Sequence, residues 1–321
     1  MKKTLLALVI ASVLPAAAFA DVTVYGKANV SLQSTDEVPL SNANGNQADG
    51  SKVELLSNAS RIGVKGGEEV NSMLKVIYQF EYQTEVDDGS GSNGQTFAQR
   101  NIYLGLQGVA GTIMGGHFDT PTKVAQEKVD LFNDLEGDIT SIFKGEIRAS
   151  NIVQYVTPTF GGGFSGSVAY VTEENNGSTG TSASFGYNSP VFYVGVAADT
   201  DVEAEGVDLI RLVGRLTLGA FQFGLLGESY ENETTGADED GVLGSAMWNI
   251  TDKWALKAQY GDSDVRWIDG ETASLGLDYK MTKNATLYGY YTMVENGQPD
   301  LVVVDNYRDD DYAGIGLDYK F

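Results

Sequence analysis

The chain has 321 residues, with 44 acidic and 21 basic side chains, one histidine and no cysteine. Its formal net charge of −23 excludes nucleic acid as a partner, because the phosphate backbone would be repelled. Without cysteine there is no disulfide framework and no thiolate metal site, and His117 alone cannot form a histidine-rich one. We therefore expect neither a metal nor a cofactor.

The first twenty residues have the three parts of an export signal. Lys2 and Lys3 give a positive start, an apolar run covers 5–14, and Ala18-Phe19-Ala20 has the small-x-small pattern of a cleavage site. We expect residues 1–20 to be a signal peptide that is removed, and 21–321 to form a single domain. An uncleaved membrane anchor is disfavoured because the apolar run is too short to span a bilayer.

From residue 22 onward, apolar and polar side chains alternate with a period of two. Val22 and Val24 share one face of the first segment, whereas Thr23, Tyr25 and Lys27 share the other. The same alternation returns in five further segments: 74–82, 101–106, 210–216, 254–260 and 273–280. This pattern is typical of strands with one face in an apolar environment and one in a polar environment.

The connections between these segments are of two kinds. Short ones lie at 68–72, 158–163, 188–190, 251–253 and 282–284. Long polar ones lie at 34–53, 86–96, 173–180, 199–206, 231–240 and 296–309. Short turns at one rim and long loops at the other indicate an all-β protein, a transmembrane antiparallel β-barrel of about 16 strands. Alternation alone would also fit a soluble β-sandwich or β-helix, but the export signal and the two kinds of connection favour the barrel.

The C-terminal segment supports the same fold. Leu317, Tyr319 and Phe321 share one face, and the last residue is aromatic. In a barrel this strand pairs with the first strand to close the ring, and its aromatic end lies at the bilayer interface.

Six motifs occur in the same order as in a known family, within a resemblance that covers the chain after the signal: 21–27, 60–66, 74–81, 100–106, 119–121 and 158–164. They resemble the trimeric general-diffusion porins of Gram-negative outer membranes. The resemblance implies a homotrimer in contact with outer-membrane lipid and lipopolysaccharide, and a barrel-insertion machinery that reads the aromatic C-terminus. It implies passive diffusion of small hydrophilic solutes and ions, with no enzymatic activity, and a loop at 86–96 that contacts a neighbouring subunit.

In this family the third extracellular loop folds into the barrel, and its acids face basic residues of the wall. The resemblance places that loop at about 119–147. The implied constriction acids are Asp119, Asp130, Asp134, Glu136, Asp138 and Glu146. The implied basic or polar wall residues are Lys27, Arg61, Lys65, His117, Arg148 and Gln154.

Two of these wall positions depart from the family pattern. His117 and Gln154 stand where the family has basic residues. A neutral histidine balances a carboxylate less well than arginine does. Fewer cations facing several acids predict a cation-preferring pore.

Other functions are less well supported. His117 beside Asp119 could suggest an outer-membrane lipase, but no nucleophile elbow accompanies them. The acidic runs 238–240 and 309–311 lack the spacing of a calcium loop and indicate solvated loops.

The tryptophans leave one question open. Trp248 and Trp254 lie on the apolar phase of their strands, as in a lipid-interface girdle, whereas Trp267 falls in a loop without an evident role. Two rival functions remain. A solute-specific channel would show saturable block by one solute, and a loop-mediated adhesin or phage receptor would be needed for attachment and not for permeability.

Overall fold

The computed structural model describes residues 21–37, 51–89, 94–172, 179–297 and 307–321. The expected signal peptide lies outside the described residues, as do the central parts of four expected loops: 34–53, 86–96, 173–180 and 296–309. Among the described residues, no helix has the length and apolar character needed to cross a membrane.

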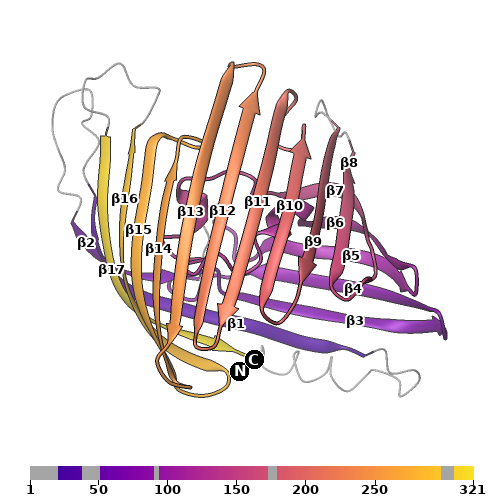
Figure 1. The fold of residues 1–321 in the computed structure, drawn as a ribbon. Coiled ribbons are helices and arrows are strands. Elements are labelled where there is room, and N and C mark those ends of the chain that lie inside the picture. The colour runs from indigo at the N-terminus through magenta and orange to yellow at the C-terminus, as the bar shows by residue number, and fades with distance from the viewer. Residues whose placement is uncertain (1–20, 38–50, 90–93, 173–178, 298–306) are drawn as a thin grey trace.

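Within these ranges, seventeen strand segments form one antiparallel sheet (Figure 1). They are β1 (Thr23–Asp36), β2 (Lys52–Ser57), β3 (Arg61–Asn71), β4 (Leu74–Gln83), β5 (Ala98–Gly108), β6 (Gly111–Asp119), β7 (Arg148–Val156), β8 (Phe164–Val171), β9 (Gly180–Asn188), β10 (Phe192–Thr200), β11 (Val207–Leu218), β12 (Phe221–Asn232), β13 (Ala237–Asn249), β14 (Trp254–Ser263), β15 (Ile268–Lys280), β16 (Ala285–Gly297) and β17 (Tyr307–Lys320). A short helix, α2 (Pro121–Ala125), and a 3-10 turn, η1 (Ile139–Ser141), lie between β6 and β7.

The sheet closes on itself. β1 pairs with β17 from Lys27 opposite Lys320 to Asp36 opposite Asp311. The backbone of Phe321 extends the seam, because its N–H and carbonyl both bond to Gly26, at 3.1 and 3.0 Å. β2 and β3 both pair with β1, one after the other, so they are two halves of one interrupted strand. The fold is thus a closed antiparallel barrel of sixteen strands, which confirms the predicted fold class.

The interruption between β2 and β3 is held by hydrogen bonds to β1. Asn58 N–H donates to Asn29 O at 2.8 Å. The hydroxyl of Ser60 accepts from Asn29 N–H at 2.9 Å and donates to Asn29 O at 3.1 Å. Ala59 between them has a positive φ of 49°, a left-handed conformation that breaks the strand. The backbone polar groups stay paired although the strand is broken.

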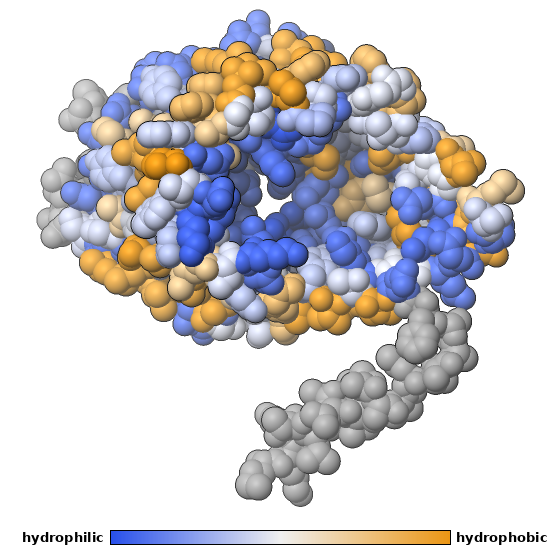
Figure 2. Space-filling model, turned by 60° about the horizontal axis from the view of Figure 1, so that its bottom comes forward, coloured by the Kyte–Doolittle hydropathy of each residue, from blue (hydrophilic) through white to orange (hydrophobic). Residues whose placement is uncertain are grey.

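The two faces of the wall have the burial pattern of a membrane barrel. On β11, Ile210 and Leu212 are 55% and 60% exposed, whereas Arg211 and Val213, which alternate with them, are 0% and 3% exposed. A water-soluble protein buries the apolar face instead. Seen from the end that carries the short turns, apolar side chains lie around the outside, and hydrophilic ones surround an opening through the barrel (Figure 2). The outer face is therefore suited to hydrocarbon and the inner face to water.

Several connections expected to be long loops are shorter than predicted, because the strands continue further. β12 runs to Asn232 and β13 begins at Ala237, so the acidic run 238–240 lies in a strand. The run 309–311 lies in β17 in the same way. The start of β1 and the end of β17 lie at the opposite rim, with the short turns (Figure 1).

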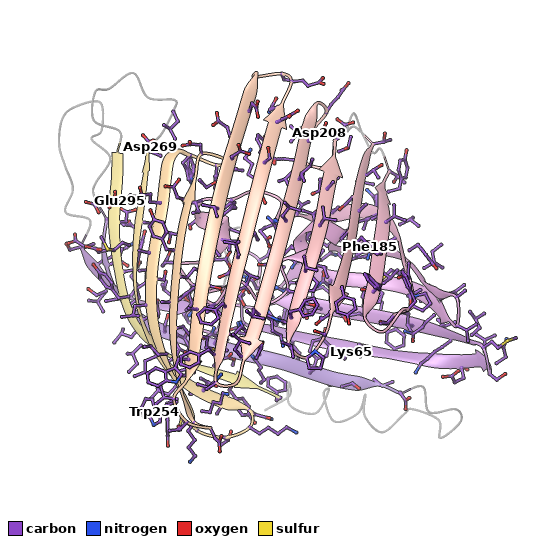
Figure 3. All side chains as sticks on the ribbon, in the orientation of Figure 1. Lys65, Phe185, Asp208, Trp254, Asp269 and Glu295 are labelled. Carbon is purple, nitrogen blue, oxygen red and sulfur yellow. The ribbon has the colours of Figure 1, made fainter. Side chains whose placement is uncertain are left out.

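These extended strand ends carry acids on the outer face. Register places Glu231 between Asp208 and Asp238, all three directly opposite one another across β11, β12 and β13. Glu295 likewise lies between Glu271 and Asp309. In Figure 3, Asp208 and Glu295 lie at the rim opposite Trp254. Directly opposed like charges repel, and water at this rim screens them.

Candidate functional site

The segment 120–147, which links β6 to β7, lies against the inner face of the barrel. Near its start, Thr122 Oγ1 donates to Asp199 Oδ1 on β10 at 2.6 Å. Further along, the N–H of Leu131 donates to Gln259 Oε1 on β14 at 2.8 Å. Because β10 and β14 lie far from β6 in the ring, the segment crosses the interior. We call it the inner loop. That it belongs to the extracellular side stays a prediction.

Apolar side chains dock the inner loop onto the wall. Ile139, Ile142 and Phe143 are at most 1% exposed. They pack in one cluster with Val129 of the same loop and with three inner-face residues of β11, β12 and β13: Val213, Leu226 and Leu243. Burying apolar area at about 25 cal/mol per Å² makes this contact favourable, and the inner loop is therefore held against one side of the barrel.

A buried ion cluster reinforces the docking. Arg211 on β11 is 0% exposed and contacts two carboxylates at 2.6 Å, Glu228 of the neighbouring β12 and Glu146 of the inner loop. A third bond runs from its guanidinium to Lys144 O at 2.7 Å. Burial raises the pKa of Glu146 to about 7, although Arg211 and Lys123 act in the opposite direction. Two carboxylates share one guanidinium, so this cluster binds a proton readily near neutral pH.

At the other side of the inner loop, Asp134 faces the wall where β1 and β3 meet. Its Oδ2 lies 2.7 Å from Lys27 Nζ and 3.7 Å from the Arg61 guanidinium. Asp134 adopts a positive φ of 69°, and its N–H donates to Asp138 Oδ2 at 2.8 Å. The left-handed backbone turns this carboxylate toward the two cations.

Further ion pairs line the wall beside it. Arg148 Nη2 lies 3.0 Å from Asp119 Oδ1, and Asn101 Nδ2 donates to Asp119 Oδ2 at 2.9 Å. Arg100 Nε pairs with Glu81 Oε1 at 3.0 Å. These groups come from β4, β5, β6 and β7, so four neighbouring strands present alternating charges to the interior.

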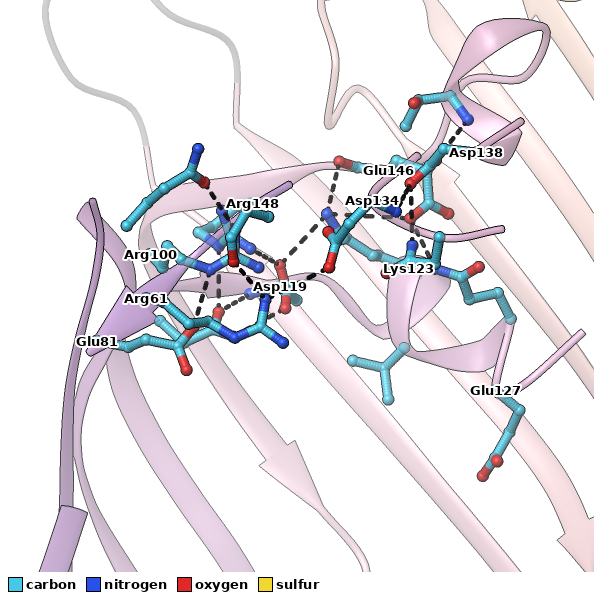
Figure 4. A pocket seen from close by; sticks show the side chains of 17 residues that line it. Arg61, Glu81, Arg100, Asp119, Lys123, Glu127, Asp134, Asp138, Glu146 and Arg148 are labelled. Carbon is cyan, nitrogen blue, oxygen red and sulfur yellow. Dashed lines mark hydrogen bonds and ion pairs between the residues drawn. The ribbon is translucent and has the colours of Figure 1, made fainter. Parts of the chain in front are cut away.

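Between the inner loop and this wall lies a hollow of about 500 Å³ (Figure 4). We call it the eyelet hollow. Its lining includes four cationic side chains, Arg61, Arg100, Lys123 and Arg148, and six acidic ones, Glu81, Asp119, Glu127, Asp134, Asp138 and Glu146. With every group ionised, four against six gives a formal balance of −2. Chemically, the hollow can admit water, ions and small polar solutes.

Four of the six acids expected at the constriction line this hollow, and two lie elsewhere. Asp130 accepts hydrogen bonds from the N–H of Phe132 at 2.9 Å and of Ile139 at 3.2 Å, so it fixes the fold of the inner loop. Burial, and then the charge of Asp138, raise its pKa. Glu136 accepts from Gln33 Nε2 at 3.1 Å and lines a smaller hollow.

Of the expected wall residues, Arg61 and Arg148 line the eyelet hollow, and Lys27 is buried behind Asp134. Lys65 lies nearer the rim with the short turns, where its Nζ is 5.0 Å from the centre of the Tyr25 ring (Figure 3). Gln154 is only 5% exposed and packs inside the wall.

His117 lies on the outer face, not in the pore wall where the sequence placed it. It is directly opposite Ile102, which shares a face with Leu104, a residue 64% exposed. Its Nδ1 lies 2.9 Å from Ser150 Oγ. The pairing of β5 with β6 is regular up to His117, and alternation along β6 places this residue on the same face as Ile113, which is 49% exposed. The argument that this position removes a cation from the constriction therefore fails.

The sequence also left out several residues of the site. Four residues that line the hollow were not predicted as site residues: Arg100, Lys123, Glu81 and Glu127. Arg211 and Glu228 were not predicted either, although they are directly opposite one another on neighbouring strands, where charges of opposite sign attract.

The remaining predictions have mixed outcomes. Leu317, Tyr319 and Phe321 are 45%, 45% and 53% exposed on the outer face, which agrees with their expected shared face. Their role in insertion stays a prediction, as does subunit contact by the loop at 86–96, part of which lies outside the described residues. In the described part of the chain, no three histidine, aspartate or glutamate side chains converge in a way that could hold a metal ion.

Comparisons with known proteins agree with this geometry. A family model described as Gram-negative porin matches residues 4–299. The chain is 35% identical over 195 residues to the major outer membrane protein P.IB of Neisseria gonorrhoeae, covering 59% of this chain and 53% of that protein. The chain therefore matches about half of that relative's length. Over 351 residues and the whole of both chains, it is 27% identical to the P.IB protein of Neisseria meningitidis serogroup B.

The fold is similar to solved structures as well. An anion-selective porin from Comamonas acidovorans superposes with a TM-score of 0.74 at 19% identity, covering 94% of this chain and 100% of that one. At this identity the likeness concerns the fold alone.

Proposed function

Because the chain belongs to the Gram-negative porin family, we propose that it forms a water-filled pore in the outer membrane, through which small hydrophilic solutes and ions diffuse passively. The observation that carries this proposal is the eyelet hollow, which is lined by ten charged side chains inside a barrel with an apolar outer face. Charges left facing an interior space need water around them.

In this function the eyelet hollow sorts solutes by size and charge and changes no covalent bond. Its width is set by how far the inner loop extends from the wall, and its charge by the pairs that face the water. The channel is thus a passive filter whose dimensions depend on the docking of one loop.

We infer a weak preference for cations, on different grounds from those the sequence suggested. The wall keeps its cations, including Arg61 and Arg148, but six acids outnumber four cations around the hollow. The acids at the rim with the extended strands add a negative potential at one mouth. Most hollow charges are paired, for example Asp119 with Arg148, so the preference is small. The anion-selective porin from Comamonas acidovorans shares only the fold at 19% identity, so its selectivity does not bear on this inference.

The proposed assembly is a homotrimer surrounded by lipid and lipopolysaccharide. The apolar outer face provides the area that lipid or a second subunit covers, and an insertion machinery would recognise the aromatic C-terminal strand.

The test is conductance of the purified, detergent-folded protein in a planar bilayer. We expect stepwise current increases, and under a gradient of potassium chloride a small reversal potential of the sign that indicates cation flow. Saturable block by one sugar or nucleoside would favour the solute-specific alternative. Absence of steps from a correctly folded barrel would contradict the pore itself, and a reversal potential of opposite sign would contradict the cation preference alone.

A further inference from the structure

The turn between β14 and β15 carries the one tryptophan that lies away from the outer face in the sequence pattern. It is fixed to the barrel rim. Val265 is 4% exposed and packs in a cluster on β11 and β12 with Val207, Leu209 and Tyr230. The N–H of Asp264 donates to Asp240 O on β13 at 3.1 Å, and Asp264 Oδ1 accepts from Asp269 N–H at 2.7 Å. The turn is therefore a rigid support.

From this support, two consecutive side chains reach the inner loop. Trp267 Nε1 donates to Ser141 O at 2.9 Å. Arg266 Nη1 donates to Thr140 O, and its guanidinium lies 5.4 Å from the centre of the indole ring. The two side chains thus support one another while each bonds to a carbonyl of η1.

The backbone hydrogen bonds within η1 do not use the carbonyls of Thr140 and Ser141. Within η1, Ile139 O accepts from the N–H of both Ile142 and Phe143. Thr140 O and Ser141 O accept from Arg266 and Trp267 instead. The pair therefore completes the hydrogen bonding of this part of the inner loop from the turn between β14 and β15.

The contact lies at the edge of the permeation path. Thr140 lines the eyelet hollow and also two neighbouring hollows of about 270 and 450 Å³. Arg266 and Trp267 line both of these neighbours. A displacement of η1 would therefore change the shape of all three spaces at once.

The inner loop does not need this contact in order to dock. Ile139, Ile142 and Phe143 hold it by apolar packing, and Arg211 holds Glu146. These anchors are apolar side chains and an ion pair inside the barrel, whereas Arg266 and Trp267 reach η1 from the turn at the rim. The two hydrogen bonds from this turn restrain η1 in addition to the docking contacts, without deciding whether the barrel folds.

We propose that Arg266 and Trp267 are positioning residues that clamp η1 and keep the eyelet hollow open, so that without them the inner loop makes brief excursions that interrupt the current. The inference rests on the proposed pore function. Each hydrogen bond contributes roughly tenfold to the ratio of clamped to released states, with the charged donor contributing more.

The experiment is single-channel recording of full-length Trp267→Phe and of the double variant Arg266→Ala/Trp267→Ala. Trp267→Phe keeps a ring but removes the N–H donor. The matched control is Trp248→Phe, which makes the same change on the outer face. There the rings of Trp248 and Phe221 stack with their centres 5.8 Å apart. We expect roughly tenfold more frequent brief closures for Trp267→Phe, more for the double variant, and wild-type behaviour for the control.

A second measurement separates positioning from folding. The midpoint of urea unfolding should stay at the wild-type value for Trp267→Phe, because its packing is retained, while closures increase. A third variant tests the clamp directly: since the chain has no cysteine, Ser141→Cys/Trp267→Cys can be joined by a short cleavable thiol cross-linker. Cross-linking should restore a quiet current, and cleavage should remove that effect.

Three outcomes would overturn the inference. The variants could be as quiet as the wild type, the control could become equally noisy, or the cross-link could fail to quiet the channel. In each case a wild type that conducts in steps leaves the proposed function standing. A folded wild type that does not conduct contradicts the proposed function instead.

Discussion

Replacing Arg211 by methionine tests whether the buried ion cluster holds the inner loop. Arg211 is 0% exposed, and the side chains of its partners Glu146 and Glu228 are 6% and 0% exposed. Methionine fills most of the volume but leaves two buried carboxylates without their cation. Breaking a buried pair in this way costs about 3–5 kcal/mol when the remaining groups are ionised. We therefore expect the free energy of unfolding to fall by about 3–5 kcal/mol at pH 8.

The loss should shrink on acidification, and the sign follows from the raised pKa of Glu146. The pKa of its carboxyl is about 7 in the folded barrel and about 4.5 in the unfolded chain. The folded state therefore binds the proton more tightly, and this stabilisation is present at low pH and lost as the pH rises from about 4.5 to about 7. At pH 5 the carboxyl is largely neutral, and we expect Arg211→Met to cost about half as much as at pH 8.

The assay is urea unfolding in detergent micelles at pH 5 and pH 8, followed by tryptophan fluorescence. Released loops also become cleavable, so trypsin cutting after Lys144 at pH 8 reports local undocking. The matched control is Arg211→Met/Glu146→Gln/Glu228→Gln, which removes the carboxylates too and should recover most of the loss. An equal loss at both pH values, or no recovery in the triple variant, would refute the reasoning.

Three further predictions concern the seam, the hollow and the rim. Gly26→Ala should slow barrel closure, because a Cβ there would meet the Phe321 ring and lie 2.8 Å from the Arg61 carbonyl on β3. The matched control is Gly214→Ala, where a Cβ has open space, and the folded fraction on unheated gels measures closure of both variants. Asp134→Asn removes an acid from the eyelet hollow, so the reversal potential should shift toward anions, and an unchanged potential would exclude this carboxylate from selectivity. Glu231→Gln relieves repulsion by the acids opposite it and should stabilise the barrel by on the order of 0.5 kcal/mol at low salt but not at 1 M salt, as thermal unfolding would report.

The strands of the barrel wall could be predicted from the sequence because the alternation of inward and outward side chains is a local property of each strand. A strand alternates its faces every residue, so Ile210 and Leu212 reveal the outer face, and Arg211 between them must point inward. Ring closure followed from the same rule applied to the last strand. These predictions required no knowledge of which segments are neighbours in space.

The same rule fails wherever the backbone adds a residue. The register shift opposite His117 adds a residue to β7, so Ser150 and Asn151 are both exposed between the buried Ala149 and Ile152, and a shift between β4 and β5 helps to bring Arg100 beside Glu81. Asn151, in the first shift, has a positive φ of 55°. Such irregularities depend on fit between two strands, so a pattern read along one strand does not contain them.

The acids of the inner loop have two different roles, and the role of each depends on its burial, which the sequence does not contain. Asp130 and Asp134 have the same chemistry and lie four residues apart. Asp130 points into the loop and fixes its turns, whereas Asp134 points to Lys27 and lines the hollow. Acids of the first kind set the shape of the constriction, and those of the second kind set its charge. A count of acids along the loop merges these roles, so ion selectivity follows from the subset that contacts water and not from the composition of the segment.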